Sequence, residues 1–303
     1  MNPLCKLRVR YLLLVALIPL VLPFRVLLAQ TDLENVLKQY DAATVSGYTQ
    51  PLADLVGANM NAGFYHTAAI PLAGLRLNLK LVGMGSVVGD DQKSFTLALP
   101  ASFSQRSMEA PTLFGGKGTV VRDQTLGTEY RPSDGIINAS LFPLVVPQLT
   151  VGSIFGTEGT LRYVPLPSSG DAIPKITLFG IGVRHSISQY LPESPLDLAA
   201  GVFYSSYTAE DLLDMKGLSI GVQASKSLEL LTLYGGVAWE QSTMNITYTS
   251  NSAGSPAVDV ELDGDNTFRL TAGGALSLGI FSLFADANFG AVTNFSGGVG
   301  FGF

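Results

Sequence analysis

The stretch NFSGGVGFGF, residues 294–303, alternates in character from one position to the next. One set of alternate positions is largely apolar and the other is nearly bare: Phe295, Gly297, Val299, Phe301 and Phe303 against Ser296, Gly298, Gly300 and Gly302. Successive residues of a strand point to opposite faces, so the stretch predicts a β-strand with one apolar face and one small face. The last core strand of a soluble β-sandwich alternates in the same way, so this stretch alone leaves that alternative open.

The first 29 residues have the order of a secretory signal peptide. Basic residues at positions 6, 8 and 10 precede an uncharged apolar run over 11–24, and the small residue Ala29 follows. An N-terminal membrane anchor is the alternative, but this run of 14 residues is shorter than the roughly 18 that a spanning helix needs. We therefore expect a signal peptide at 1–29 that is cleaved after Ala29.

Removal of this segment changes the charge and the cysteine content of the chain. The remainder has 14 basic and 24 acidic residues, a net charge of −10. A nucleic-acid partner requires a basic surface, so we expect none. The single cysteine, Cys5, leaves with the signal, so the mature chain has no disulfide, thiol nucleophile or cysteine metal ligand. We also expect no cofactor.

The mature chain hides its apolar residues in a period of two. Its mean hydropathy is positive, yet no run of about 18 apolar residues follows the signal, which argues against a helical membrane protein. Segments 75–82, 267–278 and 281–289 alternate apolar residues with polar ones, several of them charged or amide side chains. A dry sandwich core does not accept such side chains, whereas the lumen of a membrane β-barrel does.

The lengths of the connections alternate as well. Tight turns near 225–231 and 276–281 alternate with long or polar connections at 101–145, 165–174, 207–216 and 250–266, although 185–195 is longer than its position on the short side predicts. Short turns on one side and long loops on the other are typical of bacterial outer-membrane barrels. The expected strands lie near 62–69, 74–87, 92–100, 146–155, 157–165, 174–185, 196–207, 214–225, 230–249, 266–277, 279–290 and 294–303.

These strands predict an all-β transmembrane antiparallel barrel of about 12 strands, or 14 if the segment 101–145 contributes a pair. An even number places both ends of the barrel sequence on one side, and we expect both termini in the periplasm. Before the barrel, 31–44 has a capping box at Thr31 and Glu34, and Pro51 suits the first turn of a second short helix. We expect residues 30–60 to form a helical hatch at the periplasmic mouth or a plug, followed by the barrel at 61–303.

The end of the chain resembles the signal by which bacterial outer-membrane barrels reach their assembly machinery. Phe303 carries this resemblance, together with three residues on the same face of the expected strand, Phe301, Val299 and Phe295. The segments YTQPLADLVGANMNAGFYHTA (48–68) and GIGVRHSISQYLP (180–192) resemble parts of uncharacterised outer-membrane barrels akin to the long-chain fatty-acid transporters. That family has a fourteen-stranded barrel with a small N-terminal hatch and passes hydrophobic molecules laterally into the membrane. The resemblance implies a small hydrophobic ligand, but no residue here matches that family's ligand-binding residues, and the expected strand number differs.

Two motifs carry little chemistry. His185 and Ser186 are adjacent in an expected strand and point to opposite faces, so they form no dyad, and we expect no enzymatic activity. The segment 114–119 lacks the Ser or Thr that follows the Lys of a phosphate loop.

An acidic segment at 259–266 partly imitates a calcium loop. Asp259, Glu261 and Asp263 have the spacing of its first ligands, but Leu270 stands where the loop needs Glu. We expect a solvated acidic loop, or a weak divalent-ion site at these three carboxylates.

Two functions remain open at this stage. The favoured one is passive transport of a small hydrophobic solute through a barrel closed by 31–60, and the alternative is a structural, adhesin or partner-binding barrel without transport. The expected lumen residues suit either: Arg76, Asn78, Lys80, Glu240, Arg269, Asp286 and Asn288. An interior sealed by these side chains, without a lateral gap between strands, would favour the second. The expected partners are outer-membrane lipid and the barrel assembly machinery.

Overall fold

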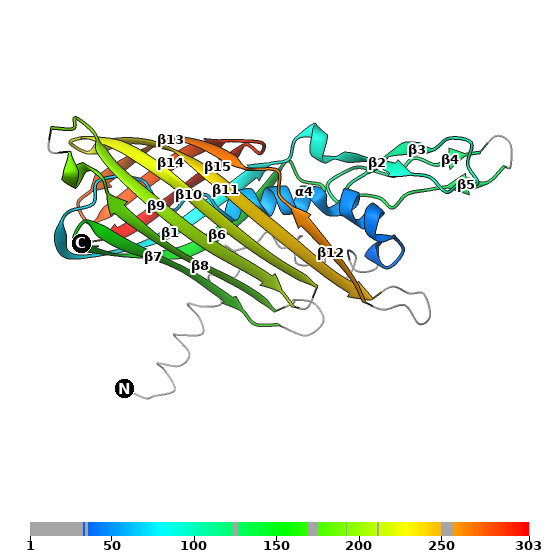
Figure 1. The fold of residues 1–303 in the computed structure, drawn as a ribbon, viewed down its shortest axis with the longest axis horizontal. Coiled ribbons are helices and arrows are strands. Elements are labelled where there is room, and N and C mark those ends of the chain that lie inside the picture. Colours follow the sequence, from blue (N-terminus) through cyan, green and yellow to red (C-terminus); the bar gives the residue numbers. More distant parts are fainter. Residues whose placement is uncertain are drawn as a thin grey trace.

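The chain folds into a closed antiparallel β-barrel of ten strands (Figure 1). The structure is a computed structural model that describes residues 33, 36–123, 127–168, 175–191, 193–210, 212–249 and 257–302. The barrel strands are β1 (Ala73–Val87), β6 (Leu141–Ile154), β7 (Thr157–Leu166), β8 (Ile176–Ser186), β9 (Asp197–Ala209), β10 (Leu213–Leu228), β11 (Leu231–Thr249), β13 (Phe268–Leu278), β14 (Phe281–Phe289) and β15 (Asn294–Gly302). Each pairs with its neighbours in sequence order, and β1 closes the barrel by pairing with β15.

The count of about 12 strands is wrong, although the fold class and the other ten strands are confirmed. The expected strand at 62–69 lies inside the barrel and is not a strand, and the one at 92–100 pairs outside the barrel. Both segments alternate in sequence because each has one side against other residues of the protein. Alternation reports that a face is buried but not which sheet the segment joins.

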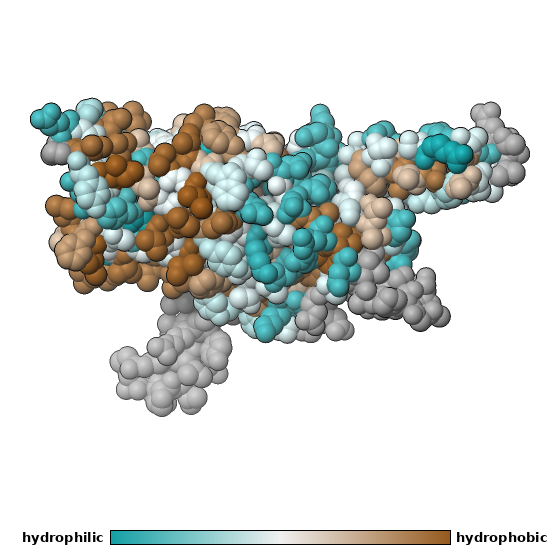
Figure 2. Space-filling model, viewed as in Figure 1, coloured by the Kyte–Doolittle hydropathy of each residue, from teal (hydrophilic) through white to brown (hydrophobic). Residues whose placement is uncertain are grey.

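The outward faces of the strands form an apolar band (Figure 2). Exposed side chains of this band include Leu79, Val151, Leu161, Ile181, Val183, Val202, Ile220, Val222, Leu233, Val237, Leu270, Leu276, Leu283 and Val299. Strand β14 has Phe281 and Phe289 at its ends, and β15 has Phe295 and Phe301 near its ends. The 9 residues of β14 span roughly 30 Å, which a tilt of about 40° reduces to roughly 23 Å. This height and its aromatic borders match the apolar band of outer-membrane barrels.

The bare face of β15 points into the barrel and makes room for side chains of the neighbouring strands. A Cβ at position 298 would lie 2.3 Å from the carbonyl oxygen of Leu81 and 2.9 Å from the ring of Phe284. A Cβ at position 300 would lie 2.4 Å from Ser282 Oγ. Glycine is therefore required on this face because larger side chains from β1 and β14 lean over it.

The two ends of the barrel differ. At the turn end lie the connections 155–156, 229–230 and 279–280, together with the helical turn η3 (Ser188–Tyr190) and the end of β15. The opposite end, the loop end, carries the longest connections, 88–140 between β1 and β6 and the one between β11 and β13. Two other connections at this end are short, 210–212 and 290–293, so the long connection expected at 207–216 is wrong because β9 and β10 extend into it. There β12 (Ala257–Asp263) pairs with the outer part of β11 and lies outside the closed ring.

The longest connection, residues 88–140, forms an arm that projects beyond the loop end (Figure 1). It contains η1 (Asp90–Gln92) and two small hairpins, β2 (Ser94–Ala98) with β3 (Ser107–Pro111) and β4 (Val121–Arg122) with β5 (Glu129–Tyr130). The arm has its own small core, which contains Leu97, Leu99, Phe103, Met108 and Ala110.

Helix α4 (Ala42–Met60) is one continuous helix instead of the expected second short one. Asp41 accepts a hydrogen bond from the Thr44 amide at 2.8 Å and caps its first turn. Pro51 lies inside the helix and not in a first turn. The chain before α4 is also helical at residue 33 and at 36–37, while Thr31 and Glu34 of the expected capping box lie outside the described residues.

Helix α4 enters the barrel at the loop end. Near its C-terminal end the Leu55 carbonyl accepts from Ser86 Oγ at 2.9 Å, and Asn59 Nδ2 donates to the Phe142 carbonyl at 2.8 Å. Ser86 is the last residue but one of β1 and Phe142 is the second residue of β6, so both contacts lie at the loop end. Helix α4 therefore lies at the end opposite the tight turns, and its expected position relative to the periplasm stays a prediction.

Residues 61–72, the lumen segment, then run through the barrel to its turn end. The Ala68 amide donates to Ser225 Oγ at 2.9 Å, and the Gly156 amide donates to the Leu72 carbonyl at 2.9 Å in the turn after β6. The chain thus starts β1 at the turn end, having come from the loop end. An even strand number fixes where β1 begins but not where α4 lies, which is why the expectation of both ends on one side fails for the described residues.

Other expectations lie beyond the described chain. The signal peptide at 1–29 and Phe303 fall outside the described residues, and the division into a hatch domain and a barrel domain stays a prediction. No helix in the described ranges has the length and hydropathy to cross a membrane.

Two glycine substitutions in β15 test the role of its bare face. We expect Gly298→Ala to lower the stability of the folded barrel by about 1–3 kcal/mol, because the new methyl group meets a backbone carbonyl and the Phe284 ring. Gly297→Ala, on the outward face, is the matched control and should cost less, since its Cβ would lie 3.0 Å from the nearest atom. Heat-modifiable gel migration of both variants measures the difference, and equal midpoints would contradict this account of the bare face.

Candidate functional site: the occupied lumen

The C-terminal end of α4 reaches the lumen with carbonyl groups that the helix cannot satisfy itself. Its last turn contains no basic residue. Two arginines of the barrel wall supply the missing donors: Arg269 Nη2 donates to the Ala58 carbonyl at 2.7 Å, and Arg162 Nη1 donates to the Met60 carbonyl at 3.3 Å. Cations at a helix C-terminus also offset the negative end of its dipole.

Arg162 is almost completely buried, with 1% of its surface exposed. Besides Met60 it donates through Nη2 to the Ala62 carbonyl at 2.8 Å and through Nε to Gln148 Oε1 at 2.9 Å. The guanidinium also lies 3.5 Å from the centre of the Phe64 ring. One side chain of β7 therefore holds both the end of the helix and the start of the lumen segment.

The other two lumen arginines are held by acids of the wall. Arg184 pairs with Glu158, and its Nη1 donates to the Thr67 carbonyl at 2.6 Å. Arg269 pairs with Glu240, with Nε 2.6 Å from Oε1 and Nη2 3.0 Å from Oε2. Arg162, Arg184 and Arg269, which we call the arginine clamp, thus each join the wall to a carbonyl of 58–67.

A second polar cluster lies on β14. Asp286 accepts from Tyr234 OH at 2.8 Å and from Asn288 Nδ2 at 2.6 Å, and also from Ser296. Thr271 Oγ1 donates to Asn288 Oδ1 at 2.7 Å. These buried groups satisfy one another, so this cluster holds its geometry without a ligand.

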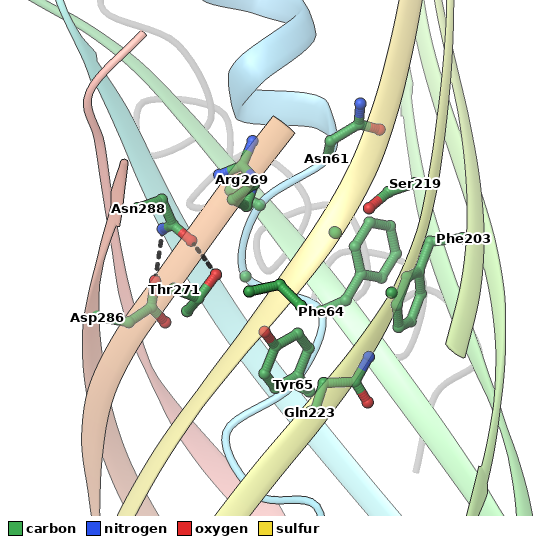
Figure 3. A pocket seen from close by; sticks show the side chains of 15 residues that line it. Asn61, Phe64, Tyr65, Phe203, Ser219, Gln223, Arg269, Thr271, Asp286 and Asn288 are labelled. Atoms are coloured by element: carbon green, nitrogen blue, oxygen red, sulfur yellow. Dashed lines mark hydrogen bonds between the residues drawn. The ribbon is translucent and has the colours of Figure 1, made fainter. Parts of the chain in front are cut away.

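Little space remains between the lumen segment and the wall at this level (Figure 3). The cavity there measures about 20 Å³, enough for one water molecule. Phe64 and Tyr65 of the lumen segment point into it from inside, and Phe203, Gln223 and Arg269 line it from the wall (Figure 3). Phe64 stacks on Phe203 with ring centres 4.4 Å apart. The lumen segment thus fills the cross-section.

The wall next to this cavity is continuously paired. Strands β10 and β11 stay in register from Leu213 opposite Ile246 to Leu228 opposite Leu231. Register shifts occur in β1 with β6 and in β6 with β7, in both cases toward the turn end. The described strands therefore show no lateral gap beside the cavity.

The seven expected lumen residues all lie on inward-facing positions of their strands. Arg76 is exposed at the turn end, Asn78 is half-buried, and the other five are buried. The structure brings Glu240 together with Arg269, and Asp286 together with Asn288. Whether they take part in transport stays a prediction.

Four functional residues were missed by sequence reasoning: Gln148, Glu158, Arg162 and Arg184. Each is a polar residue on the alternation phase of the lumen in its strand, for example Arg162 between Leu161 and Tyr163. The alternation phase predicts that these residues face the lumen. It does not identify their partners, which lie in other strands and in the lumen segment.

The remaining expected site residues do not converge on a ligand. Phe295, Val299 and Phe301 lie exposed on the outward face of β15, as an apolar band requires. No three His, Cys, Asp or Glu residues in the described ranges are placed to hold a metal ion. In the expected weak metal site, Asp259, Glu261 and Asp263 alternate along exposed positions of β12, and Asp263 accepts from Thr243 Oγ1 at 3.0 Å instead.

The two histidines are separated by the barrel wall. His185 faces outward, with Nδ1 2.8 Å from Thr157 Oγ1, whereas Ser186 is buried on the inward face. His66 lies in the lumen segment and stacks on Phe284 with ring centres 5.3 Å apart.

One acid holds α4 to the loop end. Asp54 is buried, and its Oδ1 accepts from Gln50 Nε2 and from the Asp265 amide, both at 3.0 Å. Burial raises the pKa of this carboxyl to about 6, against the two hydrogen bonds that lower it. Ionisation above that pH therefore opposes the docking of the helix.

The chain belongs to a family of unknown function (DUF6588), whose sequence model matches residues 6–303. No curated protein matches it. Among solved structures it is similar to the outer-membrane protease OmpT from Escherichia coli, with 8% identity and a TM-score of 0.34 over 78% of this chain and 98% of that one. It is also similar to a FadL homologue of Pseudomonas aeruginosa (10% identity, TM-score 0.27, 84% and 97% covered) and to the toluene transporter TbuX of Ralstonia pickettii (8% identity, TM-score 0.25, 84% and 93% covered).

Helix α4 and the lumen segment together form what we call the plug. Removal of one clamp arginine tests whether that arginine holds the plug in the barrel. We expect Arg162→Met to raise hydrogen exchange in residues 57–66 about 100-fold, since breaking a buried charged contact costs about 3 kcal/mol. Hydrogen-exchange mass spectrometry in detergent measures this effect. Lys216→Met, which removes an exposed lysine from β10, is the control. Unchanged protection in Arg162→Met would show that packing alone holds the plug.

Proposed function

We propose that this member of the DUF6588 family is a bacterial outer-membrane barrel with a closed lumen, which presents α4 and the arm at the cell surface to a partner molecule. The single observation that carries the proposal is the occupied lumen. A barrel of eight strands is just filled by its own side chains, and ten strands leave room for little more. Here the lumen segment takes that room and the arginine clamp fixes it in place.

The location in the outer membrane rests on two features of the fold. The outward band has the height and aromatic borders of lipid-facing barrels, and the longest connections lie together at the loop end. The expected signal peptide agrees with export. In such barrels the long loops face the outside, so the arm and the start of α4 would be extracellular and β15 would end in the periplasm.

The arm has the properties of a presented element. Its hairpins are ordered around their own small core, and its base is joined to α4, since the Leu113 amide donates to the Tyr48 carbonyl and Tyr48 OH donates to the Asp134 carbonyl, both at 3.0 Å. The plug and the arm therefore support each other, which links a closed lumen to a fixed surface structure.

Passive transport of a small hydrophobic solute, which the sequence favours, requires the lumen segment to move. Such movement would leave the three clamp arginines buried without the carbonyl groups to which they donate, which costs several kcal/mol. The geometry thus supports the partner-binding alternative better. We expect no catalytic activity from this arrangement.

Solute leakage separates the two functions. We expect liposomes that hold the intact mature chain to retain a fatty acid, an aromatic hydrocarbon and a small sugar as well as protein-free liposomes do. A variant without residues 31–70 lacks the plug and should leak the sugar. Leakage of the hydrophobic solutes through the intact chain alone would lead us to abandon the closed barrel in favour of transport.

Surface labelling tests the orientation. We expect an epitope inserted after Gln105, in the β2–β3 turn of the arm, to bind antibody on intact cells. The same epitope inserted after Glu229, in the tight β10–β11 turn, should bind only after permeabilisation. The reverse pattern would mean that the arm faces the periplasm and would rule out presentation at the surface.

A further inference from the structure

The lumen contains, toward its turn end and near the bare face of β15, a buried lysine without an anionic partner. Lys80 is 5% exposed, and its side chain points inward from β1. The described residues give its ammonium group no hydrogen bond or ion pair, and it lies 5.9 Å from the centre of the Phe284 ring. The buried arginines of the described lumen differ from it: Arg184 and Arg269 each pair with an acid, and Arg162 donates to Gln148 and to backbone carbonyls.

The charges that surround Lys80 add to the electrostatic cost of burying its ammonium group. Arg76, Arg162 and Arg184 all lie close enough to oppose its charge, and Glu158 is the one acid that favours it. Glu158 is already bound to Arg184. Asp197, an acid near the same end, belongs to β9, which lies across the barrel from β1 in the strand order.

Polar atoms without partners gather beside Lys80. In the described structure Asn78 Oδ1, Ser282 Oγ and His66 Nδ1 are buried and make no hydrogen bond. The position of a Cβ on Gly300 would be 2.4 Å from Ser282 Oγ, 3.3 Å from Asn78 Oδ1 and 3.3 Å from Lys80 Cγ. The side chains of Ser282, Asn78 and Lys80 therefore converge over one glycine of the bare face.

The side chains also mark a route to this point. Along the inward face of β1, Arg76 is exposed, Asn78 is half-buried and Lys80 is buried. Two cations and an amide thus lead inward from the turn end. An anion that enters there meets the positive charges of Arg76 and Lys80.

We propose that Lys80, with Ser282 and His66 as further donors and Asn78 beside them, binds a small soluble anion that carries a carboxylate or phosphate group at the turn end of the lumen. A buried ammonium without a counter-charge is costly, and an acceptor oxygen from the ligand removes that cost. The anion would accept from Lys80 Nζ and from the Ser282 hydroxyl, which otherwise stays unpaired. The site is independent of the proposed function, because it needs neither an open lumen nor a partner at the arm.

Calorimetric titration of the intact mature barrel in neutral detergent and low-salt buffer tests the site. Inorganic phosphate and sodium acetate are titrated separately, so that the two chemistries are distinguished. We expect saturable binding of at least one of them at one site and a rise in the unfolding midpoint. Lys80→Met should weaken this binding at least tenfold, and Lys216→Met, which changes an exposed lysine, should leave it unchanged.

A second readout distinguishes a binding site from a merely structural lysine. Without added anion, Lys80→Met should unfold at a higher temperature than the wild type because it removes an unpaired buried charge, and saturating anion should narrow that difference. Absence of saturable binding and of any midpoint shift with both anions in the wild type overturns the proposal. Equal binding by Lys80→Met and the wild type overturns it as well. The wild-type measurement decides the matter even if the variant does not fold.

Discussion

The C-terminal carbonyls of α4 have to be satisfied inside a barrel, and the rest of the structure depends on how this is done. A helix end without its own basic residues would be costly in a confined space. Arg162 and Arg269 solve this problem from the wall, and they are themselves fixed by Gln148 and Glu240. Helix, lumen segment and barrel are therefore one unit, because each guanidinium joins parts that lie far apart in the sequence.

The number of strands sets how much the lumen can hold. With ten strands the interior accommodates one irregular chain and the side chains that contact it. The glycines of β15 belong to the same constraint: they free space for Phe284, Ser282 and Lys80 at the level where the lumen segment leaves the barrel. The small residues on the inward face of β15 are thus explained by these three side chains, which occupy the space above them.

Alternation of side chains, together with the connection lengths and the aromatic C-terminal strand, predicted the barrel, its ten strands, its lumen phase and the outward position of Phe301. It failed where a segment alternates for another reason: 62–69 contacts the wall from inside, and 92–100 packs on the core of the arm. It also predicted Glu240 and Arg269 as lumen residues without pairing them. The clamp could not be predicted, because Arg162 acts on carbonyls about 100 positions earlier, and backbone acceptors leave no trace in side-chain identity.

The threading of residues 61–72 also dictates an order of events during folding. The ring closes where β1 meets β15, the pair of strands most distant in sequence, and such long-range contacts form late. A helix of 19 residues followed by the lumen segment cannot be pushed through an interior whose cavity beside Phe64 measures about 20 Å³. Helix α4 and the lumen segment must therefore be in place while the sheet is still open. The strands then close around them, so that the plug is the template for barrel closure.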